Sequence, residues 1–233
     1  MNSKILCVIP ARGGSKGIPY KNIKELNGKP LNMYTVDVAR QIFPDENICV
    51  TTDDQKIRSI VEDHGLHIPF VRPSCLATDQ ATSQDVLRHA LNFFEEKGLF
   101  YDAILLLQPT SPFRLKRHIE EAINLYTDKC DMVVSVKETA ANPYYNLFEE
   151  DEFGYLHISK GKGNFTRRQD APVVWEYNGS IYVINSNSLK TLTFSAFSHK
   201  IKYPMDNIYS IDIDTPLDWI VAEELLKQNM INL

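Results

Sequence analysis

Short apolar runs alternate with segments of helical periodicity over the first 137 residues of this chain, and this alternation limits the possible folds more than any other feature. The apolar runs are unbroken and β-rich, as in strands that are buried on both faces of a sheet. They cover residues 5–9, 48–51, 104–107 and 132–136. Apolar residues at helical spacing mark the segments at about 31–43, 54–64, 83–97 and 115–127. The pattern predicts an α/β fold, with a mostly parallel sheet covered by helices on both faces.

The periodicity weakens between residues 137 and 173, which predicts a small excursion from the sheet. Strand character returns over residues 173–184. The last predicted helix has a clear beginning, because Thr215 can cap it, Pro216 suits its first position and Asp218 can complete a capping box. The chain is therefore expected to end in a well-defined C-terminal helix.

Composition and charge narrow the classes of protein. With 43% apolar and 24% charged residues, the 233 residues can bury a full core, and we expect one domain over residues 1–233 with 137–173 as an insert. The net charge of -5 disfavours nucleic acid as a partner. No apolar run approaches the roughly 20 residues that span a bilayer, so we expect no membrane association. The beginning of the chain lacks the pattern of a signal peptide, and the four cysteines form no C-x-x-C pair, so a cytoplasmic location is expected.

The loop after the first predicted strand has the composition of a polyphosphate site. It contains three glycines and three cations: Gly13, Gly14, Gly17, Arg12, Lys16 and Lys21. Glycines let a ligand approach the backbone N–H groups, and the cations can offset phosphate charge. The spacing fits neither a Walker loop nor the G-x-G-x-x-G fingerprint of dinucleotide-binding folds. The alternative is a surface turn with solvated cations.

Two carboxylates near the C-terminus form a candidate metal site. Asp212 and Asp214 flank Ile213, and in an extended segment residues two apart project to the same face. Mg²⁺ prefers one or two carboxylates together with phosphate and water oxygens. The alternative is that Asp214 only helps to cap the last helix while Asp212 is solvated.

Three more polar segments follow predicted strands, where binding loops of α/β sheets lie. The segment 51–54 is expected to cap the next helix, whereas two prolines stiffen the segment 108–114, which offers Gln108 and Arg114 as hydrogen-bonding groups. The third loop contains Arg72 and residues 79–85, although Ser83 or Asp85 could serve as a helix cap. None of the six histidines has ligand spacing, so none is assigned to catalysis.

Taken together, these segments resemble a known family. In order and spacing, the chain is similar to the acylneuraminate cytidylyltransferases, also called CMP-sialic acid synthetases. The segments that carry the similarity are residues 9–23, Thr52-Asp53, Arg72-Pro73 with Leu76-Ala77 and Asp79, residues 107–114, Asn178-Gly179 with Ile181-Tyr182, and residues 212–218. The stretches P-A-R-G-G-S-K-G-I-P and L-Q-P-T-S-P-F-R form a specific pair. The resemblance implies a Rossmann-like, GT-A-like nucleotidyltransferase fold, a three-layer sandwich with a small dimerisation excursion at 137–173. It also implies a homodimer and a Mg²⁺-dependent reaction of CTP with a nonulosonic acid, which yields the CMP-sugar and pyrophosphate.

The same resemblance assigns expected roles to individual residues. Those on the nucleotide would be Ala11, Arg12, Gly13, Gly14, Ser15, Lys16, Lys21, Asn22, Arg72 and Ser83. Those on the sugar would be Gln108, Arg167, Arg168 and Tyr177, the two arginines reaching the partner's site. Metal would lie on Asp212 and Asp214, which with Arg12, Lys16 and Lys21 form the expected catalytic set.

Several activities remain open at this level. CMP-legionaminate and CMP-pseudaminate synthetases share the nucleotide chemistry. A CMP-3-deoxy-manno-octulosonate synthetase is disfavoured by the amino-acid sequence of the first loop. A metal-dependent glycosyltransferase or a nucleotide-binding module without turnover belongs to a different class. Release of pyrophosphate from CTP distinguishes the cytidylyltransferases from both.

Overall fold

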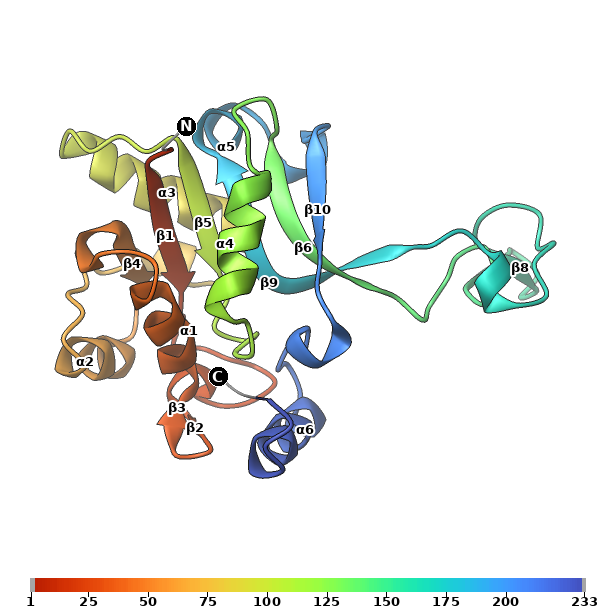
Figure 1. The fold of residues 1–233 in the computed structure, drawn as a ribbon, viewed down its shortest axis with the longest axis horizontal. Helices are drawn as coiled ribbons and strands as arrows, with labels where there is room; N and C mark the ends of the chain where they lie inside the picture. The colour runs from red at the N-terminus through yellow and green to blue at the C-terminus, as the bar shows by residue number, and fades with distance from the viewer. Residues whose placement is uncertain (1–2, 232–233) are drawn as a thin grey trace.

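A six-stranded sheet forms the centre of the computed structural model, which describes residues 3–231 (Figure 1). The strands lie in the order β10-β6-β9-β5-β1-β4. Their bounds are β1 (Ile5–Pro10), β4 (Ile48–Thr51), β5 (Ala103–Leu107), β6 (Met132–Glu138), β9 (Trp175–Asn185) and β10 (Lys200–Pro204). Only β9 runs antiparallel to its neighbours β5 and β6. The predicted mostly parallel sheet is confirmed.

Helices cover both faces of this sheet, because alternate strand residues face two separate apolar clusters. The helices are α1 (Leu31–Arg40), α2 (Gln55–Asp63), α3 (Ser83–Glu96), α4 (Lys116–Leu125), α5 (Ser186–Thr191) and α6 (Pro216–Lys227). Cys7 and Leu105 pack with α1, α2 and α4 on one face. Leu6 and Leu106 pack with α3 and α5 on the other face. The predicted three-layer sandwich is therefore confirmed.

A third apolar cluster joins the beginning of the chain to its end. Ile18 and Leu26, from the N-terminal loop and β2 (Glu25–Leu26), pack with Ile213 and with Trp219 of α6. A short hairpin of β2 and β3 (Lys29–Pro30) leads from this cluster into α1. The packing holds the N-terminal loop against the segment that contains the two predicted metal ligands.

Among the smaller features, the sequence did not reveal the β2–β3 hairpin, β10, α5 and a hairpin of β7 (Phe148–Glu150) with β8 (Leu156–Ile158). β10 is an edge strand with the sequence KIKYP, so its lysines alternate with apolar residues in a run too short to stand out. α5 has six residues, and the Asn185 side chain caps it by accepting hydrogen bonds from two backbone N–H groups. Short turns of 3-10 helix cover Lys21–Ile23, Asp45–Asn47, Ser74–Leu76, Arg168–Asp170, Phe194–Ala196 and Asn207–Tyr209.

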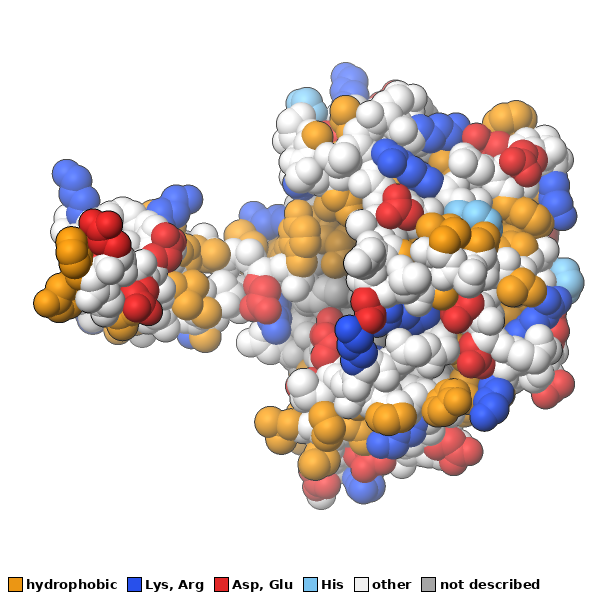
Figure 2. Space-filling view, turned by 180° about the vertical axis from the view of Figure 1, so that it is seen from behind, with side chains coloured by type: hydrophobic (Ala, Val, Ile, Leu, Met, Phe, Trp, Pro, Cys, Tyr) orange, Lys and Arg blue, Asp and Glu red, His pale blue; other side chains and the backbone are white. Residues whose placement is uncertain are grey.

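The segment between β6 and β9 leaves the body of the molecule as an extended arm (Figures 1 and 2). It contains the β7–β8 hairpin, and its exposed apolar side chains are Leu147, Phe148, Phe153, Tyr155 and Leu156. The predicted excursion at 137–173 corresponds to this arm. Among residues 3–231, no helix combines the length and hydropathy that crossing a bilayer requires.

Candidate active site

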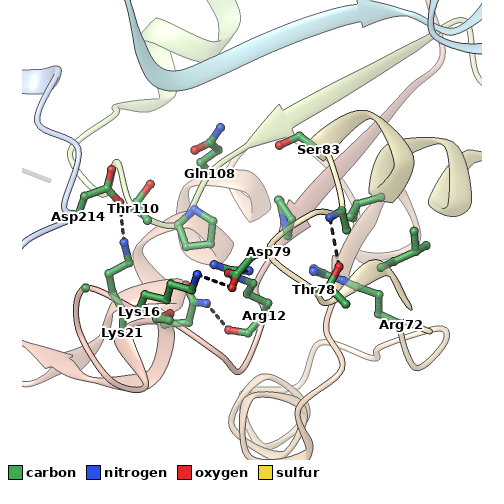
Figure 3. A pocket seen from close by; sticks show the side chains of 18 residues that line it. Arg12, Lys16, Lys21, Arg72, Thr78, Asp79, Ser83, Gln108, Thr110 and Asp214 are labelled. Carbon is green, nitrogen blue, oxygen red and sulfur yellow. Dashed lines mark hydrogen bonds and ion pairs between the residues drawn. The ribbon is translucent and has the colours of Figure 1, made fainter. Parts of the chain in front are cut away.

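A cavity of about 520 Å³ opens at the carboxyl ends of β1 and β5 (Figure 3). Its walls come from the N-terminal loop, the segment between residues 72 and 86, the loop after β5 and the segment before α6. The residues predicted for the site that line it are Arg12, Ser15, Lys16, Lys21, Asn22, Arg72, Ser83, Gln108 and Asp214. Four segments far apart in the sequence therefore meet at one edge of the sheet, where open α/β sheets bind ligands.

Lys21 connects the two ends of the chain inside this cavity. Its ammonium group donates to the Ile213 carbonyl at 2.6 Å and lies 2.8 Å from Asp214 Oδ1. Only 10% of the Lys21 side chain is exposed, whereas 69% of the Asp214 side chain is exposed. The Asp214 carboxylate therefore faces the cavity opening and does not cap α6, where Thr215 is the cap residue and Asp218 completes the capping box as predicted.

The other two cations of the N-terminal loop meet a carboxylate from across the cavity. Arg12 Nη1 lies 2.9 Å from Asp79 Oδ1, and Lys16 Nζ lies 2.6 Å from Asp79 Oδ2. The hydrogen bond from Lys16 and, to a smaller extent, the one from Arg12 hold the pKa of Asp79 below its usual value. Asn22 supports the loop from within, because its side-chain amide donates to the Arg12 carbonyl at 2.9 Å.

Two glycines of the loop occupy places where a side chain would not fit. A Cβ atom on Gly17 would lie 2.2 Å from the Asp214 carbonyl oxygen, and one on Gly13 would lie 2.6 Å from Asp54 Oδ2. The Gly13 N–H donates to Asp53 at 3.2 Å. A Cβ atom on Gly14 would face open space, with no neighbouring atom within 4 Å. Close approach of the Asp54 side chain thus explains Gly13, and close approach of the Asp214 backbone explains Gly17, but neither explains Gly14.

Asp212 lies deeper than Asp214. Its Oδ1 atom is buried and has no hydrogen-bond partner. Burial raises the pKa of Asp212 above its ordinary value, and the charge of Asp214 raises it further, while Thr110, Lys21 and Arg114 act in the opposite direction. A buried carboxylate oxygen without a partner, two residues from an exposed carboxylate, fits the ligand set that a hard divalent cation prefers. Among the described residues, no group of three or more His, Cys, Asp or Glu side chains could hold a metal ion, so the pair would need oxygens from a ligand or water.

Arg72 and Arg114 are buried cations that shape the walls of the site. Arg72 donates to the carbonyl and hydroxyl of Thr51, and burial lowers its pKa to about 10. Arg114 donates to the Gln108 carbonyl, to Ser180 and to Thr35, and burial lowers its pKa to about 9. Arg114 therefore fixes the loop after β5 by hydrogen bonds to neutral groups.

Several residues predicted for the site do not line the cavity: Ala11, Gly13, Gly14, Arg167, Arg168, Tyr177 and Asp212. Ala11 is fully buried, and its N–H extends the pairing of β1 with β4 by donating to the Thr51 carbonyl at 3.0 Å. The Ala11 side chain therefore belongs to the core, so a contact of Ala11 with the nucleotide would involve its backbone carbonyl.

The predicted sugar-binding residues other than Gln108 lie on or near the arm. Arg167 is paired with Asp170, and Arg168 lies 3.6 Å from Glu138. Tyr177 lies on β9 near the base of the arm, with about half of its surface exposed. In the single chain the arm residues are not brought to the cavity, so any role for Arg167 or Arg168 at such a site requires a second copy of the chain.

The sequence singled out Asp79 and Thr110 as parts of polar loops, but it did not assign them a role in the site. Asp79 lines the cavity and engages two of the three loop cations. Thr110 also lines the cavity, and its carbonyl accepts a hydrogen bond from the Ile213 N–H at 2.8 Å. These contacts join separate loops, so spacing along the chain carries no signal for them.

Comparisons with known proteins identify the family of this chain. The profile of the cytidylyltransferase family matches residues 6–233. The chain is 34% identical over 236 residues to the CMP-N,N'-diacetyllegionaminic acid synthase of Legionella pneumophila, with 97% of each chain covered. It is 38% identical over 221 residues to an N-acylneuraminate cytidylyltransferase of Streptococcus agalactiae, a match that covers 93% of this chain but only 52% of that protein. The chain thus spans about half the length of the streptococcal relative.

A solved structure supports the fold independently of close sequence similarity. The structure of a CMP:2-keto-3-deoxy-manno-octonic acid synthetase complexed with CTP has a TM-score of 0.70 to this chain at 17% identity. The match covers 97% of this chain and 100% of that one. The predicted Rossmann-like nucleotidyltransferase fold is confirmed, and the chain belongs to the cytidylyltransferase family of nucleotidyltransferases.

Proposed function

We propose that this protein transfers CMP from CTP to the anomeric hydroxyl of a nonulosonic acid and releases pyrophosphate. The observation that carries the proposal is the contact of Lys21 with Asp214 and the Ile213 carbonyl. This contact brings the cationic glycine loop to Asp214 on the cavity wall, and Asp212 lies two residues away, more deeply buried. A nucleoside triphosphate with a bound divalent cation requires this combination of charges.

The loop cations would bind the phosphates. Arg12 offers a planar guanidinium for two oxygens, and Lys16 offers a compact charge on a flexible stem. Both lie on the cavity wall, so they can offset the charge of pyrophosphate as its bond to the α-phosphorus breaks. The acceptor hydroxyl loses its proton to a base and forms the new bond to the same phosphorus, in line with the departing group.

Asp212 and Asp214 would hold Mg²⁺. When bound, the ion supplies charge neutralisation and polarises the phosphate oxygens. Lys21 positions the Asp214 carboxylate, because one of its hydrogen bonds fixes the backbone at Ile213 and the other fixes the side chain. The assignment is supported by the unpartnered, buried Oδ1 atom of Asp212.

Gln108 is our candidate for the sugar side of the cavity. It lines the cavity directly after β5, and Arg114 fixes its backbone by donating to its carbonyl oxygen. The names of the relatives supply the acceptor class, since one is a synthase of a CMP-legionaminic acid and another is an N-acylneuraminate cytidylyltransferase. We therefore propose a sialic acid or legionaminic acid as the acceptor.

We also propose that two copies assemble through the arm. The hairpin of the arm exposes apolar side chains that a second copy would cover. Arg167 and Arg168 also lie on the arm, and they do not line the cavity of their own chain. In such a dimer the arm of one protomer would supply these arginines to the site of the other, where they would meet the acceptor carboxylate.

A pyrophosphate-release assay tests the proposal. The purified protein is incubated with CTP, Mg²⁺ and, in turn, sialic, legionaminic, pseudaminic and octulosonic acids. We expect pyrophosphate and a CMP-sugar with sialic or legionaminic acid, and no release with a chelator present. If none of the four acids leads to pyrophosphate release, the proposal is overturned. Release of a nucleoside diphosphate from a nucleotide-sugar would identify a glycosyltransferase instead.

A further inference from the structure

Asp79 projects into the active-site cavity from the loop between the 3-10 turn Ser74–Leu76 and α3 (Figure 3). Its two carboxylate oxygens are divided between two cations on the opposite wall. Oδ1 accepts from Arg12 Nη1 at 2.9 Å, and Oδ2 lies 2.6 Å from Lys16 Nζ. One carboxylate therefore bridges the cavity from wall to wall.

These two cations are the ones that we propose for the phosphates of CTP. A phosphate oxygen that accepts from the same N–H groups of Arg12 and Lys16 would take the positions that the Asp79 oxygens occupy. A carboxylate beside the phosphates would also repel them. Asp79 and a bound phosphate group are therefore competitors for the same donors.

The exposure of the three side chains sets the strength of this competition. The Arg12 side chain is 34% exposed, that of Lys16 is 77% exposed and that of Asp79 is 47% exposed. Ion pairs at such exposure are weak and exchange readily, so a triphosphate can displace the carboxylate. The pairs are nevertheless strong enough to change affinity by a measurable factor.

We propose that Asp79 is an internal competitor for the pyrophosphate end of the nucleotide. The triphosphate displaces its carboxylate from Arg12 and Lys16 on binding, and the carboxylate returns to them as pyrophosphate leaves. Asp79 thus limits retention of the leaving group. This inference rests on the proposed function, because that function places pyrophosphate at these two cations.

The inference separates three ligands. CTP and pyrophosphate both carry the group that must displace Asp79, whereas CMP carries only the phosphate that becomes bound to the sugar. Removing the Asp79 charge should therefore strengthen binding of CTP and pyrophosphate and leave CMP binding unchanged. If Asp79 only held its loop in place, its removal would weaken all three ligands instead.

The test is a calorimetric titration of the whole protein with CTP, pyrophosphate and CMP, in the wild type and in Asp79→Asn. We expect the dissociation constants of CTP and pyrophosphate to fall about threefold to tenfold, as the loss of two partly exposed ion pairs allows. Inhibition by pyrophosphate should tighten by the same factor. CMP should bind both proteins alike.

Two control variants complete the experiment. Asp79→Glu keeps the charge and should stay within about twofold of the wild type for each ligand. Asp128→Asn removes an exposed carboxylate before β6, at the opposite edge of the sheet, and tests for a general effect of net charge. A fall in the dissociation constants that Asp128→Asn reproduces would overturn the inference.

The remaining outcomes separate the two proposals. If the wild type releases pyrophosphate but Asp79→Asn binds CTP and pyrophosphate equally well or more weakly, the role of Asp79 is wrong and the proposed function stands. If the wild type neither binds CTP nor releases pyrophosphate, the proposed function fails and the inference falls with it.

Discussion

Gly17 is a residue at which the two ends of the chain approach each other closely in the site. Its missing side chain leaves room for the Asp214 carbonyl oxygen, which would lie 2.2 Å from an added Cβ atom. The conflict is with backbone, so a larger residue has to move the loop or the carboxylate segment. The geometry that joins cations and carboxylates therefore depends on the absence of a side chain at position 17.

Gly17→Ala should reduce pyrophosphate release by on the order of tenfold or more, because small displacements of positioning groups cost large factors in rate. Gly14→Ala is the matched control, since Gly14 belongs to the same loop and an added Cβ there has no neighbour within 4 Å. Initial rates at saturating CTP measure both variants. Equal rates would show that the loop accommodates the side chain without moving the site.

Asp214→Asn should lower turnover by on the order of a hundredfold or more while the fold stays intact, because metal-assisted charge stabilisation is lost. The replaced side chain is 69% exposed, its amide oxygen can still accept from the buried Lys21, and Lys21 also keeps the Ile213 carbonyl as a partner. Rates across a range of Mg²⁺ concentrations, together with the melting temperature, provide the test. An unchanged rate at limiting Mg²⁺ would remove the carboxylate pair from the mechanism.

At the scale of elements, helix caps place the polar loops at the edge of the sheet. Thr82 caps α3 and Thr215 caps α6, each in a capping box with an aspartate three residues later. The sequence predicted the second box correctly. For α3 it offered Ser83 or Asp85 as the cap, whereas the cap is Thr82, with Asp85 as its partner.

Thr215→Ala should lower the free energy of unfolding by about 1 kcal/mol and also reduce pyrophosphate release. The second effect is expected because Asp218, the partner of Thr215 in the box, also accepts a hydrogen bond from the Asp214 N–H at 3.1 Å. Asn185→Ala removes the cap of α5 and serves as the control. It should lose stability without losing activity, and a comparable loss of activity in both variants would show that global stability limits the assay.

At the scale of the whole molecule, the arm is the feature that a single chain leaves unexplained. Figure 2 shows it as a lobe that projects from the body, and its hairpin exposes Phe148, Phe153 and Leu156. Apolar surface of this kind marks an interface. The dimer that we propose would cover it and would bring Arg168 to a cavity that its own chain does not let it reach.

Mixing two inactive variants tests this exchange. In a mixed dimer of the Arg168→Ala and Asp214→Asn chains, one of the two sites has an intact Asp214 from the first chain and an intact Arg168 from the second. Random pairing during co-refolding makes about half of the dimers mixed, so it should restore about a quarter of the wild-type activity. No recovery, in a mixture that light scattering shows to be dimeric, would contradict a shared site; a monomeric wild type would contradict the dimer itself.

Local patterns made much of the fold predictable. The buried runs at β1, β4, β5 and β6 and the helical spacing of α1 to α4 involve neighbours within a few turns, so they can be seen in the sequence. β10 escaped prediction because an edge strand with lysines at alternate positions has no unbroken apolar run. The antiparallel direction of β9 depends on the path of the arm, which no local pattern specifies.

The alternating elements, their caps and the composition of the loops follow from local sequence, because they depend on backbone sterics and on contacts between near neighbours. Which loops meet depends on the tertiary fold. Lys21 reaches Asp214 across 193 positions, and Arg12 reaches Asp79 across 67, through packing of the sheet and of the cluster around Trp219. A charged side chain can be recognised in the sequence. The residue with which it pairs depends on how apolar surface is buried elsewhere, and this burial is a property of the whole fold.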